Sequence, residues 1–440
     1  MNIRFYNAGI LTMDGRAEDP MEIFMGEVWV EGSRITYVGR EKSVCGAGDS
    51  LNALETPVWD REIDACGNLL MPGFKNAHTH SAMTFLRSYA DDLPLLDWLN
   101  QQVFPMEAKL LPEDILWLSK LAIMEYLTSG VTANFDMYFH PEMIAKASVD
   151  CGFRTVMVSS FNDFVSSLEE MEENYKKYNQ YHDLISYCLG FHAEYTTSEE
   201  RLKGVAALAE KYKAPVFAHN SETKAEVEQC VERHGMTPTA YLDALGMFAY
   251  GGGGYHCVYM SDGDLEIFRK RDLTVVTNPG SNTKLASGIA PVTEMLKRGI
   301  RLAVGTDGPA SNNCLDMFRE MFLVTGLGKL REENAAAVPA DQVLEMAVGG
   351  GAKAMGLTDC DCLAEGKLAD LIMIDLHQPN MQPLNNIIKN LVYSGSKQNV
   401  KLTMVNGKIL YEDGRFDIGV DPEAVYAKAN EIIGRMTAKA

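Results

Sequence analysis

Short apolar runs alternate with amphipathic segments through the middle of the chain, from residue 69 to residue 358. Eight of these runs have the length of a β-strand, and they span residues 70–72 continuing to 78–80, 132–137, 154–160, 185–192, 215–219, 254–258, 273–278 and 301–307. This alternation is typical of βα units around a parallel sheet. Eight strands suit a closed barrel, so we predict an α/β fold with a (β/α)8 barrel of the TIM type over residues 69–358.

Both ends of the chain have a different pattern, in which short strands alternate with tight turns. The clearest hairpins are residues 26–38, turning at Gly32-Ser33, and residues 402–411, turning at Asn406-Gly407. Asn-Gly between two apolar runs is a strong signal for a two-residue hairpin. We therefore predict that residues 1–68 and 359–440 are β-rich accessory parts, with a helix after Pro422.

The longest connection of the predicted barrel, residues 81–111, follows the first strand. It is apolar and partly aromatic, with Phe85, Trp98 and Phe104 along it. A long segment beside a barrel mouth can act as a lid over the site. The same spacing of apolar residues also suits a plain helix that covers the barrel, and both interpretations stay open.

The composition is that of an ordinary globular protein, with 46% hydrophobic and 23% charged residues in a chain of 440. A net charge of −20 repels phosphates and anionic lipids, so neither nucleic acid nor a membrane is an expected partner. Arg4, Asn7 and Asp14 interrupt the apolar runs of the opening segment, which lacks the features of a signal peptide. The nine cysteines have no paired spacing, which favours a reducing, cytoplasmic location.

Histidines and an aspartate concentrate at the ends of the predicted strands, where barrel enzymes carry their reacting groups. His78 and His80 are two residues apart on one strand, so both imidazoles point to the same side. This pair alone is a weak indication, because strand histidines also serve as hydrogen-bonded core or surface groups. His219 and Asp307 end two further strands, and three imidazoles with one carboxylate suit Zn²⁺ or Fe²⁺. We predict a divalent metal site made of these residues.

Two further groups are candidates for catalysis. Glu222 follows His219 by three residues and is placed to reach a substrate, although an acid in the first turn of a helix is the alternative. His256 ligates the ion, hydrogen-bonds a water held by it, or is a core histidine. The fourth run, residues 185–192, lacks the lysine that bridges two ions in many binuclear barrel hydrolases. We therefore expect one divalent ion per chain, with Zn²⁺ favoured and Fe²⁺ as the alternative.

Several stretches of the chain form recognisable motifs. They read PGFKNAHTHSAMTFLRSYADDLPLLDWL (72–99), PMEAKL (105–110), HNSE (219–222), HCV (256–258), NPGSNTKLASGIAPV (278–292) and GTDGPASNN (305–313). Together they resemble the amidohydrolase superfamily, in its subgroup of 5-methylthioadenosine/S-adenosylhomocysteine deaminases and related chlorohydrolases. The resemblance covers nearly the whole chain, and it implies that both β-rich ends join into one small sandwich beside the barrel.

The resemblance also implies roles for individual residues. The implied metal ligands are His78, His80, His219 and Asp307, and the implied substrate contacts are Glu107, Arg154, His192, Glu222 and Asp307. Two positions depart from the family pattern. Glu194 replaces the proline that usually precedes Tyr195, and residues 166–179 lack a second arginine that some members carry. Without that arginine, the sequence does not predict a clamp for an amino-acid carboxylate.

Together with these residues, the resemblance implies hydrolytic deamination of an adenosine-type nucleoside, namely 5-methylthioadenosine, S-adenosylhomocysteine, adenosine or 5'-deoxyadenosine. The ion would lower the pKa of its water from about 15.7 towards about 7. Asp307 would take the water's proton and pass it to the leaving amine, Glu222 would protonate the ring nitrogen, and His256 would stabilise the attacking oxygen.

Two alternatives accompany this hypothesis. One is another aminohydrolase or chlorohydrolase of the same superfamily, acting on guanine, a pterin or an s-triazine. The other is a non-catalytic barrel paralogue that serves as a binding module, against which the complete set of metal ligands argues. We also expect the chain to form a homo-oligomer.

Overall fold

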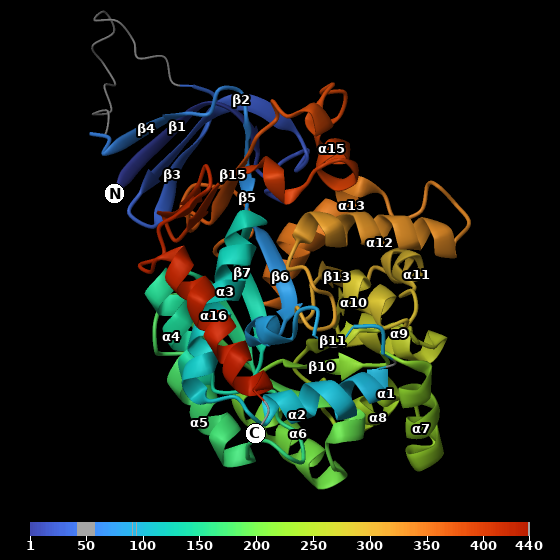
Figure 1. Ribbon diagram of the computed structural model, residues 1–440. Helices are drawn as coiled ribbons and strands as arrows, with labels where there is room; N and C mark the ends of the chain where they lie inside the picture. The colour runs from blue at the N-terminus through green and yellow to red at the C-terminus, as the bar shows by residue number, and fades with distance from the viewer. Residues whose placement is uncertain (42–57, 90, 94, 439–440) are drawn as a thin grey trace, which may run out of the picture.

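Eight parallel strands form the centre of the computed structural model, which describes residues 1–41, 58–89, 91–93 and 95–438 (Figure 1). They are β6 (Phe74–Thr79), β7 (Val131–Met137), β8 (Arg154–Val158), β9 (Ile185–Ala193), β10 (Val216–Asn220), β11 (Gly252–His256), β12 (Thr274–Thr277) and β13 (Arg301–Val304). Neighbours in the sheet are neighbours in the chain, from β6 to β13. The amide of Asp307 donates to His78 O at 3.0 Å and joins the last strand to the first. The predicted (β/α)8 barrel is confirmed.

The first predicted strand needs a correction. Leu69–Pro72 form β5, which belongs to the second sheet, and the barrel begins only at Phe74 in β6. The prediction that residues 70–72 lead the barrel is wrong. All four residues of β5 are buried, and a short apolar run of this kind looks the same in either sheet.

Glycines allow β11 to lie close to both neighbouring strands. A Cβ atom on Gly252, which has φ of 117°, would lie 2.0 Å from the carbonyl oxygen of Val216. A Cβ atom on Gly253 would lie 2.1 Å from the carbonyl oxygen of Thr274. Only glycine fits such a close approach, and it brings the end of this strand, His256, to the barrel interior.

The two ends of the chain join in a nine-stranded mixed sheet beside the barrel (Figure 1). Its strands are β1 (Asn2–Leu11), β2 (Ile23–Glu31), β3 (Arg34–Gly39), β4 (Arg61–Asp64), β5, β14 (Leu371–Ile374), β15 (Val400–Val405), β16 (Lys408–Glu412) and β17 (Arg415–Phe416). The sheet encloses a core of its own, to which both chain ends contribute, and a bridge between Arg34 and Leu368 links the two parts. The predicted union of the β-rich ends is confirmed. Residues 42–57 of the predicted N-terminal part lie outside the described residues.

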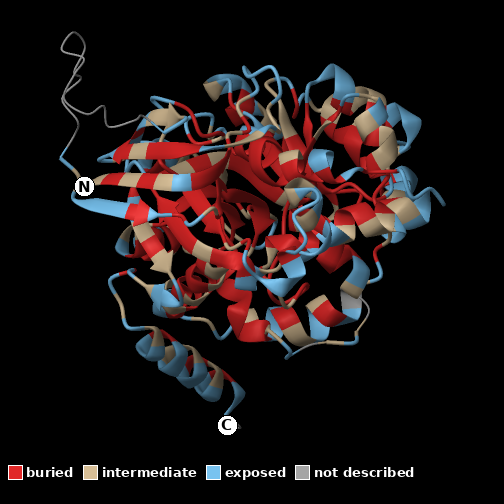
Figure 2. Cartoon of the chain, turned by 90° about the horizontal axis from the view of Figure 1, so that it is seen from above, coloured by how far each residue is buried: buried red, intermediate tan, exposed pale blue. Residues whose placement is uncertain are grey.

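Helices surround the barrel and leave the buried residues at the centre of the molecule (Figure 2). The longer ones are α3 (Pro112–Thr128), α4 (Pro141–Cys151), α5 (Leu168–Tyr178), α6 (Glu199–Tyr212), α7 (Lys224–His234), α9 (Asp262–Lys270), α12 (Met317–Arg331) and α16 (Pro422–Thr437). The shorter ones are α8 (Pro238–Ala244), α10 (Pro279–Lys284), α11 (Val292–Lys297), α13 (Ala340–Glu345), η4 (Met346–Gly350), α14 (Gly351–Ala354) and α15 (Ile387–Tyr393). The predicted C-terminal helix is α16, and Lys109 donates to Met436 O near its end at 2.7 Å.

The segment after the first barrel strand folds into short helical turns rather than one plain helix. These are η1 (Ser81–Leu86), α1 (Leu95–Trp98), the π-helical turn η2 (Leu99–Val103) and α2 (Phe104–Glu107). Asp91 ties the segment to the barrel loops, because Lys284 donates to its Oδ1 at 2.6 Å and Asn313 to its Oδ2 at 3.0 Å. A lid role stays a prediction, and Ala90 and Pro94 lie outside the described residues.

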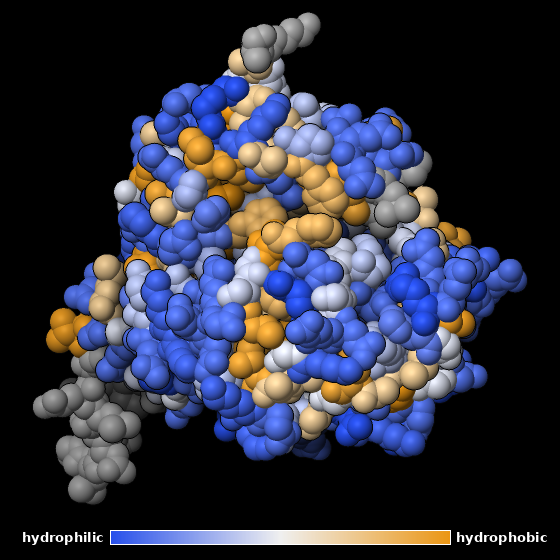
Figure 3. Space-filling model, turned by 90° about the horizontal axis from the view of Figure 1, so that it is seen from below, coloured by the Kyte–Doolittle hydropathy of each residue, from blue (hydrophilic) through white to orange (hydrophobic). Residues whose placement is uncertain are grey.

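The surface is mainly hydrophilic, as Figure 3 shows for the face seen from below. Hydrophobic side chains gather around a hollow on this face. Among the described residues, no helix is both long and apolar enough to cross a membrane.

Candidate active site

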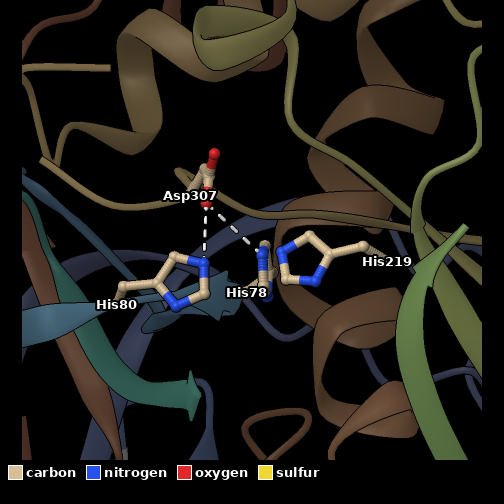
Figure 4. Close-up of side chains that lie close together, drawn as sticks. All are labelled: His78, His80, His219 and Asp307. Atoms are coloured by element: carbon tan, nitrogen blue, oxygen red, sulfur yellow. Dashed lines mark ion pairs between the residues drawn. The ribbon is translucent and has the colours of Figure 1, made fainter. Parts of the chain in front are cut away.

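His78, His80, His219 and Asp307 converge at the carboxyl ends of barrel strands (Figure 4). One ligand atom from each side chain lies within 4.8 Å of the others. Asp307 Oδ1 is 3.4 Å from His78 Nε2 and 3.2 Å from His80 Nε2. The structure therefore brings together all four residues that the sequence assigned to a metal site.

Strand alternation explains how two neighbouring histidines reach the same point. Thr79, between them, points the other way and hydrogen-bonds Tyr126 Oη at 2.8 Å.

The backbone at Asp307 is left-handed, with φ of 58°, and that at His256 has φ of 68°. Non-glycine residues adopt this conformation at a cost, and such strained positions concentrate at functional sites.

Backbone carbonyls orient two of the imidazoles. His80 Nδ1 donates to Met137 O at 2.5 Å, and His219 Nδ1 donates to His192 O at 2.7 Å. Each bond places the ring's hydrogen on Nδ1 and leaves Nε2 with a free lone pair, as in many metal-binding histidines.

Unpaired polar atoms in the cluster also indicate that it can hold a divalent cation. Neither ring nitrogen of His78 has a hydrogen-bond partner among the described residues, and the ring is fully buried against Tyr255, 3.7 Å away between centroids. A buried polar group without a partner costs about 1–3 kcal/mol. A cation facing Nε2 would supply the missing partner.

Protonation states also favour a cation. Burial lowers the pKa of His78 to about 3 and that of His219 well below its usual value, so both rings are neutral. Burial alone would raise the pKa of Asp307, but the adjacent imidazoles of His78 and His80 hold it well below its usual range. Neutral imidazoles and an ionised carboxylate are the forms that bind metals.

His80 differs from the other two histidines. Burial opposes its charged form, but the hydrogen bond with Asp307 outweighs burial and raises the pKa of His80. A divalent ion held by these ligands would supply positive charge beside Asp307 and would favour the neutral form of the His80 ring.

Glu222 and His256 lie beside the cluster, as the sequence predicted. His256 Nε2 is 3.9 Å from Glu222 Oε2, and both residues are buried. Asn282 Oδ1 accepts a hydrogen bond from His256 Nδ1 at 2.8 Å, and Ser287 donates to Glu222 Oε1 at 3.2 Å. An acid and an imidazole are thus held in fixed positions next to the metal ligands.

His192 and Glu107 reach the same region from other elements. The His192 ring lies 4.8 Å from the His219 ring, and its Nδ1 is 3.0 Å from Thr196 Oγ1. Glu107 ends α2, and Tyr138, which follows β7, donates to its Oε1 at 2.6 Å. Burial raises the pKa of Glu107 to about 7, although the Tyr138 hydrogen bond works against this rise.

Arg154 does not belong to the site. It is the first residue of β8 and therefore lies at the amino end of the barrel, whereas the metal ligands lie at the carboxyl ends. Its guanidinium donates to both oxygens of Asp370, at 2.7 and 3.0 Å, and to Asp183 O at 3.1 Å. The prediction that Arg154 contacts the substrate is wrong, because this buried ion pair uses its donors elsewhere.

Glu194, the departure from the family pattern, has its charge paired. Its Oε2 is 2.6 Å from Arg233 Nη2, and its Oε1 is 3.2 Å from His234 Nε2. Both partners belong to α7. This carboxylate therefore adds no free negative charge at the site.

Several residues that hydrogen-bond the candidate groups were not predicted from the sequence. They are Tyr138, Ser281, Asn282, Ser287 and Ser311. The four residues from 281 to 311 lie within the motifs NPGSNTKLASGIAPV and GTDGPASNN, so the motifs contained them without revealing their partners.

A barrel that gathers three imidazoles and a carboxylate beside a second acid is the architecture of a metal-dependent hydrolase. The model of the amidohydrolase family matches residues 69–410, and the chain belongs to this family.

Named relatives are similar over nearly their whole length. The chain is 39% identical over 422 residues to the 5-methylthioadenosine/S-adenosylhomocysteine deaminase of Thermoanaerobacter pseudethanolicus, with 94% of each chain covered. It is 38% identical over 419 residues to the 5'-deoxyadenosine deaminase of Methanothermobacter thermautotrophicus, covering 94% of this chain and 95% of the relative. The crystal structure of a zinc-bound adenosine deaminase from Xanthomonas campestris matches with a TM-score of 0.90 and 31% identity, covering 99% of this chain and 98% of the other.

Proposed function

We propose that this protein hydrolyses the exocyclic amine of an adenosine-type nucleoside and releases the inosine analogue and ammonia. The observation that carries the proposal is the acid Glu222, held 3.9 Å from His256 beside four residues suited to a metal. The deaminase relatives, at 38–39% identity over 94% of this chain, support it.

The ion in this proposal is one Zn²⁺ per chain, with Fe²⁺ as the alternative. His78, His80, His219 and Asp307 would hold it. When bound, such an ion makes water nucleophilic near neutral pH, by lowering its pKa from about 15.7 towards about 7. Zinc in the related adenosine deaminase from Xanthomonas campestris supports this choice.

The chain's own residues would move the protons. Asp307 accepts the proton of the attacking water and later delivers it to the leaving nitrogen. Glu222 protonates the ring nitrogen next to the attacked carbon, so that negative charge does not accumulate on the heterocycle. His256, fixed through Asn282, orients the incoming oxygen. Addition of the water oxygen forms the C–O bond first; the C–N bond then breaks, ammonia leaves with the proton from Asp307, and the hydroxyl proton of the adduct returns to Glu222.

Glu107 is the residue that would read the ribose. A carboxylate can accept from both ribose hydroxyls, and the bond from Tyr138 leaves Glu107 with lone pairs for them. A nucleoside is therefore the proposed substrate rather than free adenine.

The 5' substituent would be uncharged. Arg154 is engaged with Asp370 at the other end of the barrel, and residues 166–179 contain no arginine. A terminal carboxylate such as that of S-adenosylhomocysteine thus finds no bidentate partner at either of these two places. Methylthioadenosine, adenosine and 5'-deoxyadenosine should be turned over at least as efficiently as S-adenosylhomocysteine.

A substrate panel tests this function. Zinc-loaded protein should release ammonia from adenosine nucleosides, but neither ammonia from guanine or a pterin nor chloride from an s-triazine. Glu222→Gln should abolish most of the activity, whereas Glu228→Gln, an exposed carboxylate on α7, serves as the matched control and should retain it. Faster turnover of guanine, a pterin or an s-triazine would replace the proposal by one of those activities.

A further inference from the structure

Two hydroxyl groups hold one oxygen of Asp307. Ser281 and Ser311 donate to its Oδ2 at 2.7 and 2.6 Å. The other oxygen, Oδ1, faces His78 and His80. The two serines thus determine which carboxylate oxygen turns towards the other metal ligands.

A second carboxylate, Glu320 of α12, lies behind both serines. Its Oε2 accepts from the amide of Gly280 at 2.8 Å, and its Oε1 accepts from Asn312 Nδ2 at 2.8 Å. Gly280 precedes Ser281, and Asn312 follows Ser311. Glu320 therefore bridges the two turns that present the hydroxyls to Asp307.

The bridge continues to the backbone of the aspartate loop. Asn312 Nδ2 also donates to Thr306 O at 2.7 Å, one residue before Asp307. The packing is tight, because a Cβ atom on Gly280 would lie 2.4 Å from Glu320 Oε1 and 2.7 Å from Asn312 Nδ2. Neither turn can shift far without breaking a bond to Glu320.

Glu320 occupies an energetically unfavourable position for an acid. Its side chain is fully buried, and no ion pair with it is found in the part of the chain that the structure describes. Burial raises the pKa of Glu320 to about 8, although hydrogen bonds from Gly280 and Asn312 oppose the rise. A buried carboxylate that lacks a cation costs stability, and its hydrogen bonds to Gly280 and Asn312 offset part of this cost.

We propose that Glu320 is a positioning residue for Asp307, clamping the Ser281 turn to the Ser311 turn so that both hydroxyls reach Oδ2. Glu320 touches neither the substrate nor the reacting atoms. The expected effect on kcat rests on the proposed function, in which Asp307 carries protons. The geometry of the clamp does not depend on the reaction.

Glu320→Gln tests the clamp with a change of almost no volume. The new amide nitrogen cannot accept a hydrogen bond, so the bond from Gly280 or from Asn312 is lost. If the Asn312 amide turned so that its oxygen accepted from the new nitrogen, its bond to Thr306 O would break. We expect kcat to fall about tenfold or more with KM within about twofold, because misplaced catalytic groups affect the chemical step. The visible spectrum of the Co²⁺-substituted protein should change while one equivalent of metal stays bound.

A double-mutant cycle separates the clamp from a loss of stability. In a Ser281→Ala/Ser311→Ala background, Glu320→Gln should lower kcat no further, because the clamp acts only through the two hydroxyls. Glu27→Gln serves as the matched control, because Glu27 is a buried carboxylate of the nine-stranded sheet. This variant should lower stability without changing kcat or the Co²⁺ spectrum. Additive losses, or an unchanged kcat and spectrum in Glu320→Gln, would overturn the proposal.

A second variant covers the case in which Glu320→Gln does not fold. Asn312→Ser removes one arm of the clamp and leaves the buried acid in place. It should change the Co²⁺ spectrum in the parent protein, and the change should be smaller in the Ser311→Ala background, where only the bond to Thr306 O remains to be lost. The Co²⁺ spectrum reports on the ligand geometry even if no nucleoside is deaminated, so failure of the clamp and failure of the proposed function remain distinguishable.

Discussion

Arg154→Met should destabilise the protein without affecting its recognition of substrate. The Arg154 and Asp370 side chains are 4% and 0% exposed, and two hydrogen bonds of 2.7 and 3.0 Å join them. Methionine keeps the length of the side chain but leaves the Asp370 carboxylate buried without its cation. The amide of Asn406, at 2.7 Å, continues to donate to it.

The expected loss of unfolding free energy is about 3–5 kcal/mol, the range for breaking a buried ion pair from one side. Almost no solvent screens this pair, so the full range applies. The matched control is Arg269→Met, whose partner Glu266 is exposed; those side chains are 50% and 39% accessible. An exposed pair contributes little to stability, so this variant should unfold close to the parent protein. Replacing both buried partners, as in Arg154→Met/Asp370→Leu, should recover most of the loss.

Urea unfolding followed by tryptophan fluorescence measures these differences, and steady-state deamination measures recognition. Below the unfolding transition, Arg154→Met should bind S-adenosylhomocysteine with the KM of the parent protein. Parent-like stability together with a KM raised only for S-adenosylhomocysteine would refute this reasoning and return Arg154 to the substrate site.

Four further predictions concern the site itself. Elemental analysis should find about one divalent ion per chain, lost in His219→Ala; two ions would contradict the mononuclear proposal. Glu222→Gln should keep its metal yet lower kcat about 10²-fold or more, and a near-normal kcat would reduce Glu222 to a helix-start acid. Because the pKa of Glu107 is raised to about 7, its ionised form, which accepts from the ribose hydroxyls, is lost as the pH falls through that value. KM should then rise for adenosine but not for 2',3'-dideoxyadenosine. The same pH dependence of KM for both nucleosides would exclude the ribose role. Finally, kcat/KM for methylthioadenosine should equal or exceed that for S-adenosylhomocysteine, and a preference of more than about tenfold for the latter would show that another cation replaces the missing arginine.

Strand periodicity and strand ends made the fold and the metal ligands predictable from the sequence. Alternation places His78 and His80 on one side of β6, and a parallel barrel brings His219 and Asp307 to the same end. The sequence does not distinguish residues 70–72 from a barrel strand, because every residue of β5 is buried, as in a strand of a parallel barrel.

Residues whose role depends on their partners were beyond sequence reasoning. Arg154 is a plausible ligand for an anion until the structure shows it beside Asp370, 216 positions away in the chain. Ser281 and Ser311 come from different loops and meet only at Asp307. Serine hydroxyls follow no periodic pattern along the chain from which this shared contact could be predicted.

Isotope incorporation tests the central claim most directly. Metal-loaded protein is incubated with methylthioadenosine in H₂¹⁸O, and the products are analysed by mass spectrometry together with an ammonia assay. Hydrolytic deamination predicts one ¹⁸O on C6 of the base of methylthioinosine and one ammonia for each product molecule. Free adenine without ¹⁸O, or an unchanged nucleoside with the metal site fully loaded, would contradict the account.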